Sequence, residues 1–555
     1  MTTIIRNIFS TEVFRAELSI MKLAIPMFVL YIVRTSSASV SIYFAGQLGK
    51  EHLDGVGISN TLYAAVENAF TIGYTNVFDT YGPQVYGSRH RKELSTIALK
   101  CVAQGTIIYL FVLGPYLNLV YLIDVLPDDI DGVTGSSSSE FKDVAKQYLR
   151  MTASCCYLTF LINIMTNYLA IQKQTKFVYL IAVVGFSSHF VLNYVFISKF
   201  SLGTTGLALA TIGGLLTTSL FAFTVCFIMI RRGVLVWGGI SGRMFDNWLP
   251  MIKLGVSGVI SLIAEIGLFE GAVFLSQFDS STVLSTFLIQ FRALVFAFSN
   301  AVGFSYAGAV RTGKALSQGD LYQVKLNMKL SIFNVITGST ILSIVAYFIR
   351  KPMVMLFTDD TDIIDMSCNF MWMFCLLMPI DHLQAVLAGG VLVSFGKQRF
   401  IALVIGLTAS LVGLPIVALS VFLTDLHIAG IYISYMTFCV LLVVAFVIRI
   451  WKLDFDEEIK KAAERVNESS LKIENRLDRR TNGTVNKAYE PEFDETVMKR
   501  FKDTFPEEED REVTRRFSVS KPTYCRARDT KVIILAFFGS IVSCTMFGLI
   551  SIIHN

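Results

Sequence analysis

Apolar residues dominate the chain in thirteen long blocks, which short polar stretches separate from one another. A helix that crosses a bilayer needs about 20 mostly apolar residues, and each block is long enough to supply them. The first block is also too long for a secretory signal. The pattern therefore predicts thirteen membrane-spanning helices, near residues 20–46, 56–85, 96–124, 143–170, 174–198, 203–230, 248–276, 282–310, 324–349, 364–394, 398–424, 427–450 and 531–552.

Lysine and arginine side chains gather in alternate loops between these blocks. The amino-terminal residues and the even-numbered short loops hold 15 of them, whereas the short odd-numbered loops hold 5. Because positive charge is retained on the cytoplasmic side of a membrane, the amino terminus and residues 452–530 are predicted to be cytoplasmic. The last residues, 553–555, are then extracellular, and the plasma membrane is the expected location.

The chain divides into two similar parts and a charged appendix. Gly206 and Gly430 precede equivalent blocks with an offset of 224 residues, and Gly87 and Gly313 follow equivalent blocks with an offset of 226. Six spans intervene, so equivalent helices run in the same direction, as in parallel-repeat transporters. We predict an all-α membrane protein of two parallel-repeat six-helix lobes plus a thirteenth transmembrane helix. The parts are an N-terminal lobe (1–235), a C-terminal lobe (236–451), a cytoplasmic charged linker (452–530), helix 13 (531–552) and an extracellular tail (553–555).

Composition supports this reading and excludes several classes of protein. The chain is 53% hydrophobic and only 16% charged, against about 25% charged in soluble domains. Residues 452–530 alone hold 18 Lys/Arg and 19 Asp/Glu, which predicts a linker with one amphipathic helix near 455–475. A soluble enzyme, a nucleic-acid binder and a secreted disulfide scaffold are excluded. Phosphate-loop and zinc motifs are absent from the sequence, so we expect no enzyme activity and no cofactor.

Six ionisable residues lie inside the predicted spans, where charge is costly and usually functional: Arg34, Glu67, Glu265, Glu270, Arg292 and Asp381. Five residues separate Glu265 from Glu270, so the two side chains point about 140° apart on their helix. A carboxylate in apolar surroundings that titrates near the working pH can bind either a proton or a cation, and mutually exclusive binding is the basis of antiport. The alternative is that these carboxylates pair with Arg34 or Arg292 and only hold helices together.

The chain also resembles a known family, the eukaryotic type of multidrug and toxic compound extrusion (MATE) transporter, over residues 20–450. Short motifs in both halves carry the resemblance: Leu48-Gly49-Lys50, Asp79-Thr80 with Gln84 and Tyr86-Gly87-Ser88, Asn193-Tyr194, Trp237-Gly238-Gly239, Ala264-Glu265 with Glu270, Gly303-Phe304-Ser305, Val310-Arg311, Gly313, Gly319-Asp320, and Asp381 with Leu383-Gln384 and Gly390-Val391-Leu392. A thirteenth helix after a charged linker is similar to animal members.

The resemblance implies roles for particular residues. Glu265 and Glu270 match the carboxylates of helix 7 that bind protons and cations in the family, and Asp381 matches its acidic position in helix 10. This chain departs from the family pattern at Arg292, where relatives have a third carboxylate, and at Tyr31, where relatives usually have an amide. An added Arg34 follows one turn after Tyr31.

Weaker candidates complete the predicted site. An aromatic cleft for flat organic cations could form from Tyr31, Tyr63, Tyr74, Phe291, Phe296 and Phe298, although a role in the core or toward lipid is the alternative. His382 could sense protons or be a helix-interface residue. Pro26 could be a hinge or a static kink, and Pro83 is expected to end the second span.

These observations favour a secondary active exporter that exchanges an organic solute, cationic and of variable structure, for protons by alternating access between two lobes. Its ion- and substrate-binding residues are predicted to be Glu265, Glu270, Asp381, Arg292, Arg34, Tyr31 and Glu67. The coupling ion is the proton, with Na⁺ as the alternative. The expected partners are a small organic solute and the lipid bilayer, without nucleic acid, and the protein is expected to be a monomer. Two other hypotheses are an exporter of anionic solutes that bind Arg34 and Arg292, and a flippase or receptor with a similar number of helices.

Overall fold

The computed structural model describes residues 11–124, 140–240, 242–276, 281–355, 358, 360–424 and 426–465. Within these residues every regular element is helical. Helix 13, the extracellular tail and most of the charged linker, as predicted from the sequence, lie outside the described residues. The α-helices are α2 (Thr11–Leu48), α3 (Lys50–Gly87), α4 (Leu94–Asn118), α5 (Val120–Asp124), α6 (Glu140–Met151), α7 (Cys155–Ile171), α8 (Thr175–Asn193), α9 (Gly203–Arg231), α10 (Trp248–Ser276), α11 (Ser281–Ala297), α12 (Ser299–Ser317), α13 (Leu321–Phe348), α14 (Arg350–Met355), α15 (Thr361–Ala385), α16 (Gln398–Thr408), α17 (Leu414–Phe422) and α18 (His427–Trp451).

Short 3₁₀ and π segments interrupt or join these helices. The 3₁₀ turns are η1 (Arg91–Glu93), η2 (Thr152–Ser154) and η4 (Gly242–Phe245). The π segments are η3 (Tyr194–Lys199), η5 (Val386–Leu392) and η6 (Ala409–Gly413), and they continue α8, α15 and α16 without a break in the helical rod. Segments of this kind occur often at functional sites, and η5 contributes to the cavity described below.

Eleven of the described helical rods are long and apolar enough to cross a membrane. All twelve blocks predicted between residues 20 and 450 lie on helices. The second block, on α3, is not among the eleven rods, because polar residues such as Glu67, Asp79 and Gln84 lower its hydropathy. The multi-helix membrane architecture is therefore confirmed, whereas the arrangement of twelve spans plus one stays a prediction.

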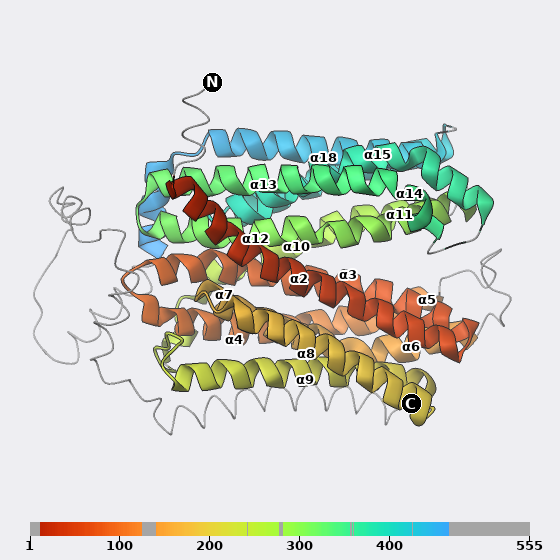
Figure 1. Cartoon of the computed structure of the whole chain (residues 1–555), viewed down its shortest axis with the longest axis horizontal. Coiled ribbons are helices and arrows are strands. Elements are labelled where there is room, and N and C mark those ends of the chain that lie inside the picture. The colour runs from red at the N-terminus through yellow and green to blue at the C-terminus, as the bar shows by residue number, and fades with distance from the viewer. Residues whose placement is uncertain are drawn as a thin grey trace, which may run out of the picture.

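The helices gather in two bundles, one from each half of the chain (Figure 1). We call residues 11–231 the N-terminal half and residues 248–465 the C-terminal half. One hydrophobic core is built mainly from residues between 70 and 251, and a second from residues between 268 and 446. Burial of apolar side chains in two separate clusters is what two packed bundles require. The lobe boundary at residues 235/236 stays a prediction.

Two helices cross from one bundle to the other. The beginning of α2 packs through Ile20 and Ala24 on residues of α12 and α13, whereas Phe44 and Ala45 at its other end pack within the N-terminal half. In the same way, α10 packs on α3 at its start and on α16 and α17 further along. Pro26 lies inside α2, whose helix runs on in both directions. The two bundles are thus joined by a pair of helices in equivalent positions of the predicted repeat.

A group of hydrogen bonds joins the two halves near one end of α3. Thr80 donates to the Val393 carbonyl over 2.8 Å and Gln84 donates to the Ser394 carbonyl over 2.8 Å. Gln398 donates back to Thr80 over 2.7 Å. We call the place where residues 76–87 meet residues 393–398 the contact end.

Pro83 was expected to end the second span, and this expectation is wrong. The helix α3 passes through Pro83 and continues to Gly87. Tight packing explains the continuation, because Pro83 lies against Gly313 and Gly87 lies against Ser317 and Lys314 of α12. A proline removes one backbone donor, and these contacts hold the helical path across the gap.

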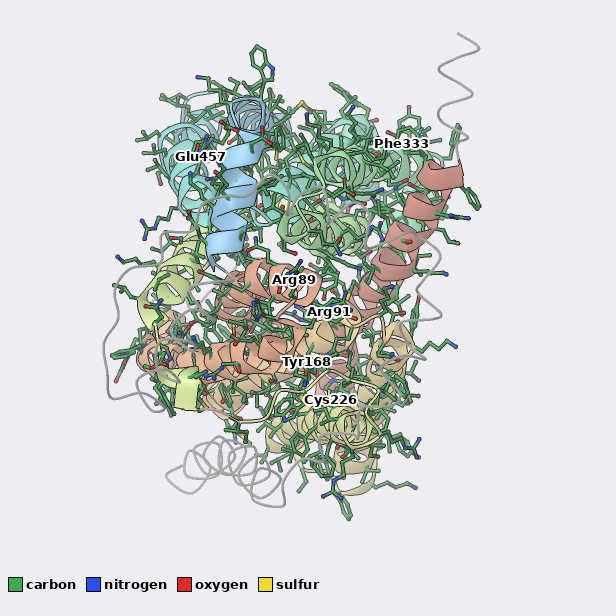
Figure 2. The ribbon with its side chains drawn as sticks, turned by 90° about the vertical axis from the view of Figure 1, so that its left-hand side faces the viewer. Arg89, Arg91, Tyr168, Cys226, Phe333 and Glu457 are labelled. Atoms are coloured by element: carbon green, nitrogen blue, oxygen red, sulfur yellow. The ribbon has the colours of Figure 1, made fainter. Side chains whose placement is uncertain are left out.

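A short helix over residues 455–465 covers part of the contact end. Its Ala462, together with Leu453 just before the helix, packs on Leu316 and Phe395. Lys397 pairs with Glu458 over 2.6 Å, and Arg465 donates to the Phe395 carbonyl over 2.9 Å. The amphipathic helix predicted near 455–475 is confirmed over its described part. Figure 2 looks at the end of the molecule where Arg89, Arg91 and Glu457 lie.

Candidate functional site

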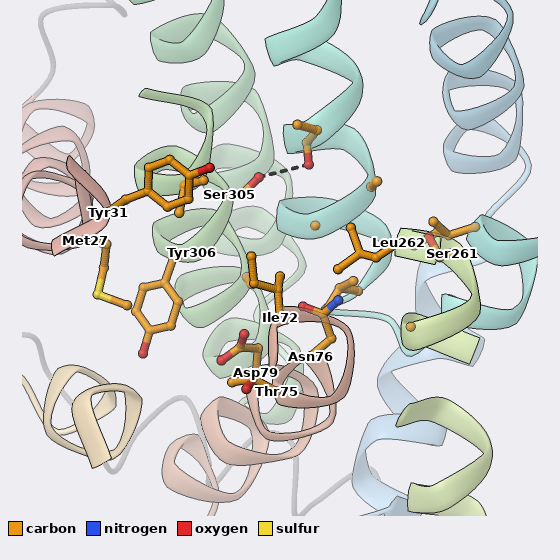
Figure 3. A pocket seen from close by; sticks show the side chains of 18 of the residues that line it. Met27, Tyr31, Ile72, Thr75, Asn76, Asp79, Ser261, Leu262, Ser305 and Tyr306 are labelled. Atoms are coloured by element: carbon orange, nitrogen blue, oxygen red, sulfur yellow. Dashed lines mark hydrogen bonds between the residues drawn. The ribbon is translucent and has the colours of Figure 1, made fainter. Parts of the chain in front are cut away.

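A cavity of about 240 Å³ lies between the two halves. Its walls come from α2, α3 and α7 of the N-terminal half and from α10, α12, α15, η5 and α16 of the C-terminal half. Figure 3 shows part of this wall, with Thr75, Asn76 and Asp79 on α3 across from Ser261 and Leu262 on α10. Because both halves line it, movement of one half relative to the other would change its shape and its access.

The C-terminal half places an acid network at the cavity wall. Glu265 on α10 lines the cavity, and its Oε1 accepts a hydrogen bond of 3.1 Å from Gln384 Nε2. The same amide group lies 3.4 Å from Asp381 Oδ1, which also accepts from the Tyr435 hydroxyl over 3.1 Å. Asp381 is only 2% exposed and lies behind Glu265. Gln384 thus connects a cavity-facing carboxylate to a buried one.

Arg34 lines the cavity, but its partner differs from the ones considered from the sequence. Its guanidinium donates to Glu67 over 2.5 Å and 2.6 Å and to Asn68 over 2.8 Å. Glu67 is 4% exposed. One alternative from the sequence was an ion pair between Arg34 and Glu265. That alternative is wrong, because Arg34 pairs with Glu67 and Glu265 bonds to an amide. The spacing of 33 residues between partners on α2 and α3 carries no local pattern that sequence reasoning could have used.

Asp79 is a second carboxylate of the cavity wall, and sequence reasoning missed it as a site residue. Its Oδ1 accepts a hydrogen bond of 2.8 Å from Asn167 Nδ2 on α7. The residue lies inside the predicted second span, so counting it among the intramembrane charges would have found it. Its position next to Thr80 places Asp79 within the contact end.

The predicted aromatic cleft forms only in part. Tyr31 and Phe298 line the cavity, with 6.5 Å between their ring centroids. Tyr74 is buried in the N-terminal half and donates to Gln104 over 2.8 Å. The other three, Tyr63, Phe291 and Phe296, are absent from the cavity wall. Three of the six, Tyr63, Tyr74 and Phe291, are buried in or packed on the two cores, whereas Phe296 is exposed.

The remaining candidates lie outside the cavity or outside the described side chains. Glu270 is half-buried on α10 and does not line the cavity, in agreement with its predicted rotation away from Glu265. Arg292 lies on α11, and its side chain is outside the described residues. His382 is buried with its ring 5.8 Å from that of Phe298, so it is a helix-interface residue.

No group of three metal-ligating side chains comes together within the part of the chain described.

Comparisons with known proteins agree with this architecture. A sequence model of the MatE family matches residues 26–195 and 260–419, which together are more than half of the chain. The chain belongs to the MatE family. Members of this MATE family are transporters, so this chain is a multi-pass membrane transporter. Family membership favours transport over the flippase and receptor hypotheses.

Similar proteins span most of the chain. Multidrug and toxin extrusion protein 1 of Homo sapiens is 25% identical over 471 residues, which are 83% of this chain and 79% of that protein. Multidrug and toxin extrusion protein 2 of Homo sapiens is 24% identical over 504 residues, with shares of 82% and 80%. The crystal structure of the eukaryotic MATE transporter AtDTX14 superposes with a TM-score of 0.74 at 17% identity, and covers 82% of this chain and 99% of that one. The MATE fold is thereby shown.

The Arg34–Glu67 pair leads to a stability prediction for this transporter. Replacing Arg34 with glutamine leaves the Glu67 carboxylate buried without a counter-charge, and we expect a loss of about 3 kcal/mol in the free energy of unfolding. The double variant Arg34→Gln/Glu67→Gln removes both charges and should recover most of that loss. Thermal unfolding of the purified protein in detergent measures both. Equal stability of the single variant and the wild type would show that the pair contributes nothing.

Proposed function

We propose that the protein is a secondary active exporter, which exchanges a cationic organic solute for protons. The observation that carries this proposal is that Glu265 faces the cavity with an amide and no cation as its described partner. A cavity-facing carboxylate of this kind can hold either a proton or a positively charged group. Its connection through Gln384 to Asp381 supplies a second, buried acid that can store a proton.

The charge of the cavity wall favours cations over anions. Among the described lining residues, Glu265 and Asp79 are acidic, and the basic Arg34 is engaged by Glu67. An anionic solute at Arg34 would lie beside the Glu67 carboxylate that already neutralises it, and would also face two carboxylates at the wall. We therefore prefer the cationic solute to the anionic alternative. The proton is preferred to Na⁺ because the group that Glu265 contacts in the described part of the chain is an amide N–H donor, whereas a metal cation needs oxygen ligands.

Alternating access between the halves is the proposed mechanism. The two cores pack separately, and several hydrogen bonds that cross between the halves lie at the contact end, on Thr80 and Gln84. Breaking a few of these bonds while forming contacts at the opposite end would move access from one side to the other. The crossing pairs α2–α12 and α3–α10 occupy equivalent places in the predicted repeat, which supports two lobes that move as units.

We propose the plasma membrane as location, with the contact end in the cytoplasm and the protein acting as a monomer. The basic residues Arg89 and Arg91 lie at the contact end (Figure 2), and retention of positive charge in the cytoplasm supports this orientation. The helix 455–465 covers the same end and would lie in the cytoplasm as well. The carboxyl terminus is then extracellular if residues 531–552 cross the membrane.

Uptake into proteoliposomes tests the proposed function. Liposomes with an acidic interior should take up radiolabelled tetraethylammonium faster than liposomes with equal pH on both sides, because protons leave as the cation enters. An aliphatic carboxylate of similar size should show no such acceleration. Acceleration of the carboxylate instead of the cation would replace this proposal with the anionic alternative, and absence of flux for both would contradict it.

A further inference from the structure

The cavity presents two carboxylates that hold separate positions, and only one of them belongs to the acid network. Glu265 connects through Gln384 to Asp381 in the C-terminal half. Asp79 stands on the N-terminal half, with Asn167 as its hydrogen-bond partner. Within the described residues Asp79 forms no ion pair, and its second carboxylate oxygen has no hydrogen-bond partner. The wall of the N-terminal half therefore carries a carboxyl group for which no described side chain supplies a counter-charge.

The packing of α3 on α10 fixes the depth of each carboxylate. Gly73 touches Gly258, and Tyr74 touches Gly255, so the two helices run in opposite directions. Asp79 follows Gly73 toward the contact end, and Glu265 follows Gly258 away from it. Asp79 and Glu265 lie six and seven residues from this crossing in opposite directions, which is about 20 Å of combined backbone rise. The two carboxylates therefore stand at different depths of the cavity wall, which allows a solute and a proton to bind at separate places.

Acceptor groups surround Asp79 on the side of the contact end. Gln398 also lines the cavity, is 2% exposed, and donates to Thr80 and to the Asn76 carbonyl over 2.7 Å and 3.5 Å. Its amide oxygen is buried without a hydrogen-bond partner in the described part of the chain. A buried acceptor without a partner is costly, and a ligand with N–H or cationic groups would satisfy it. Figure 3 shows Asp79 with Thr75 and Asn76, and with Tyr306 of the neighbouring helix.

We infer that Asp79, oriented by Asn167, binds the positively charged group of the organic solute, while the Glu265–Gln384–Asp381 network takes the proton. This inference rests on the proposed function. In the proposed orientation Asp79 is the first carboxylate that a solute meets when the contact end opens. Its neighbour Thr80 and the Gln398 amide belong to the contacts that close this end. A cation bound at Asp79 would thus lie against the contacts that must break and re-form in each cycle.

The variant Asp79→Asn in the full-length protein tests this assignment. Asparagine keeps the size of the side chain and a hydrogen bond to Asn167, and removes only the charge. In proteoliposomes we expect the KM for tetraethylammonium to rise at least about tenfold, since a charge–charge contact in a shielded cavity is lost. The acceleration of uptake by an acidic interior should persist, because the proton site is intact.

Two further variants separate charge from structure. Asp79→Glu keeps the charge and should stay within about threefold of the wild-type KM. Asp320→Asn makes the same chemical change at an exposed helix cap on α13, where the side chain accepts from the Gln323 backbone N–H, and should leave the KM unchanged. A single symmetric elution peak for each variant shows that the fold is retained.

Different results would overturn different statements. An unchanged KM in Asp79→Asn would overturn the assignment of Asp79. If the KM is unchanged and the pH response is lost as well, Asp79 would be the proton site instead. Wild-type uptake that saturates but ignores the pH gradient would contradict the proposed proton coupling, and the KM comparison would still decide the role of Asp79. Absence of saturable tetraethylammonium uptake by the wild type would overturn both.

Discussion

Proton-driven exchange should be abolished when Glu265 is replaced by glutamine. Glutamine keeps the shape of the side chain and can still bond to Gln384, but it does not gain or lose a proton near neutral pH. The cavity then loses the one described carboxylate that connects its wall to buried Asp381. We expect the accelerating effect of an acidic interior on tetraethylammonium uptake to disappear, with the amount and elution of the protein unchanged.

The control for this variant is a glutamate that lies far from the cavity. Glu464 is exposed on the helix 455–465, so Glu464→Gln makes the same chemical change in water and should retain wild-type exchange. Exchange at the wild-type rate in Glu265→Gln would remove Glu265 from the coupling mechanism. Loss of exchange in both variants would point to a general effect of lost negative charge rather than to the acid network.

The helical architecture was predictable because it depends on local composition. Long apolar blocks specify helices directly, and each of the twelve blocks between residues 20 and 450 lies on a helix. The ends were less predictable. Pro83 carries a strong local signal for a helix end, yet α3 passes through it, because packing on Gly313 of α12 is a tertiary effect that no local pattern records.

The candidate site was only partly predictable, for a related reason. Glu265 and Asp381 stand out as charges in apolar surroundings, and the structure brings them together through Gln384. Glu67 stands out in the same way, but its charge is balanced by Arg34. Whether a charge in a membrane helix is paired or faces a cavity depends on which helices are neighbours. That information lies in the packing of residues far apart in the chain.

The helices α3 and α10 touch at one point with no side chain between them. A methyl group on Gly258 would lie 2.2 Å from the Gly73 carbonyl oxygen, and one on Gly73 would lie 2.7 Å from the Val259 Cα. Both obstacles are backbone atoms, which cannot turn aside as a flexible side chain can. We therefore expect Gly258→Ala to separate the two helices, and to lower the initial rate of tetraethylammonium uptake at least about tenfold, because an overpacked contact costs about 1–3 kcal/mol.

The matched control is Gly267→Ala on the same helix, where an added methyl group meets no atom within 4 Å. Both substitutions remove a glycine from the interior of α10 and raise its helix propensity equally, so the two variants differ only in what the methyl group touches. Gly267→Ala should transport at the wild-type rate, and Gly73→Ala should behave like Gly258→Ala. Equal rates for Gly258→Ala and Gly267→Ala would mean that the halves tolerate separation at this point. Alternating access would then have to proceed without tight apposition of α3 and α10.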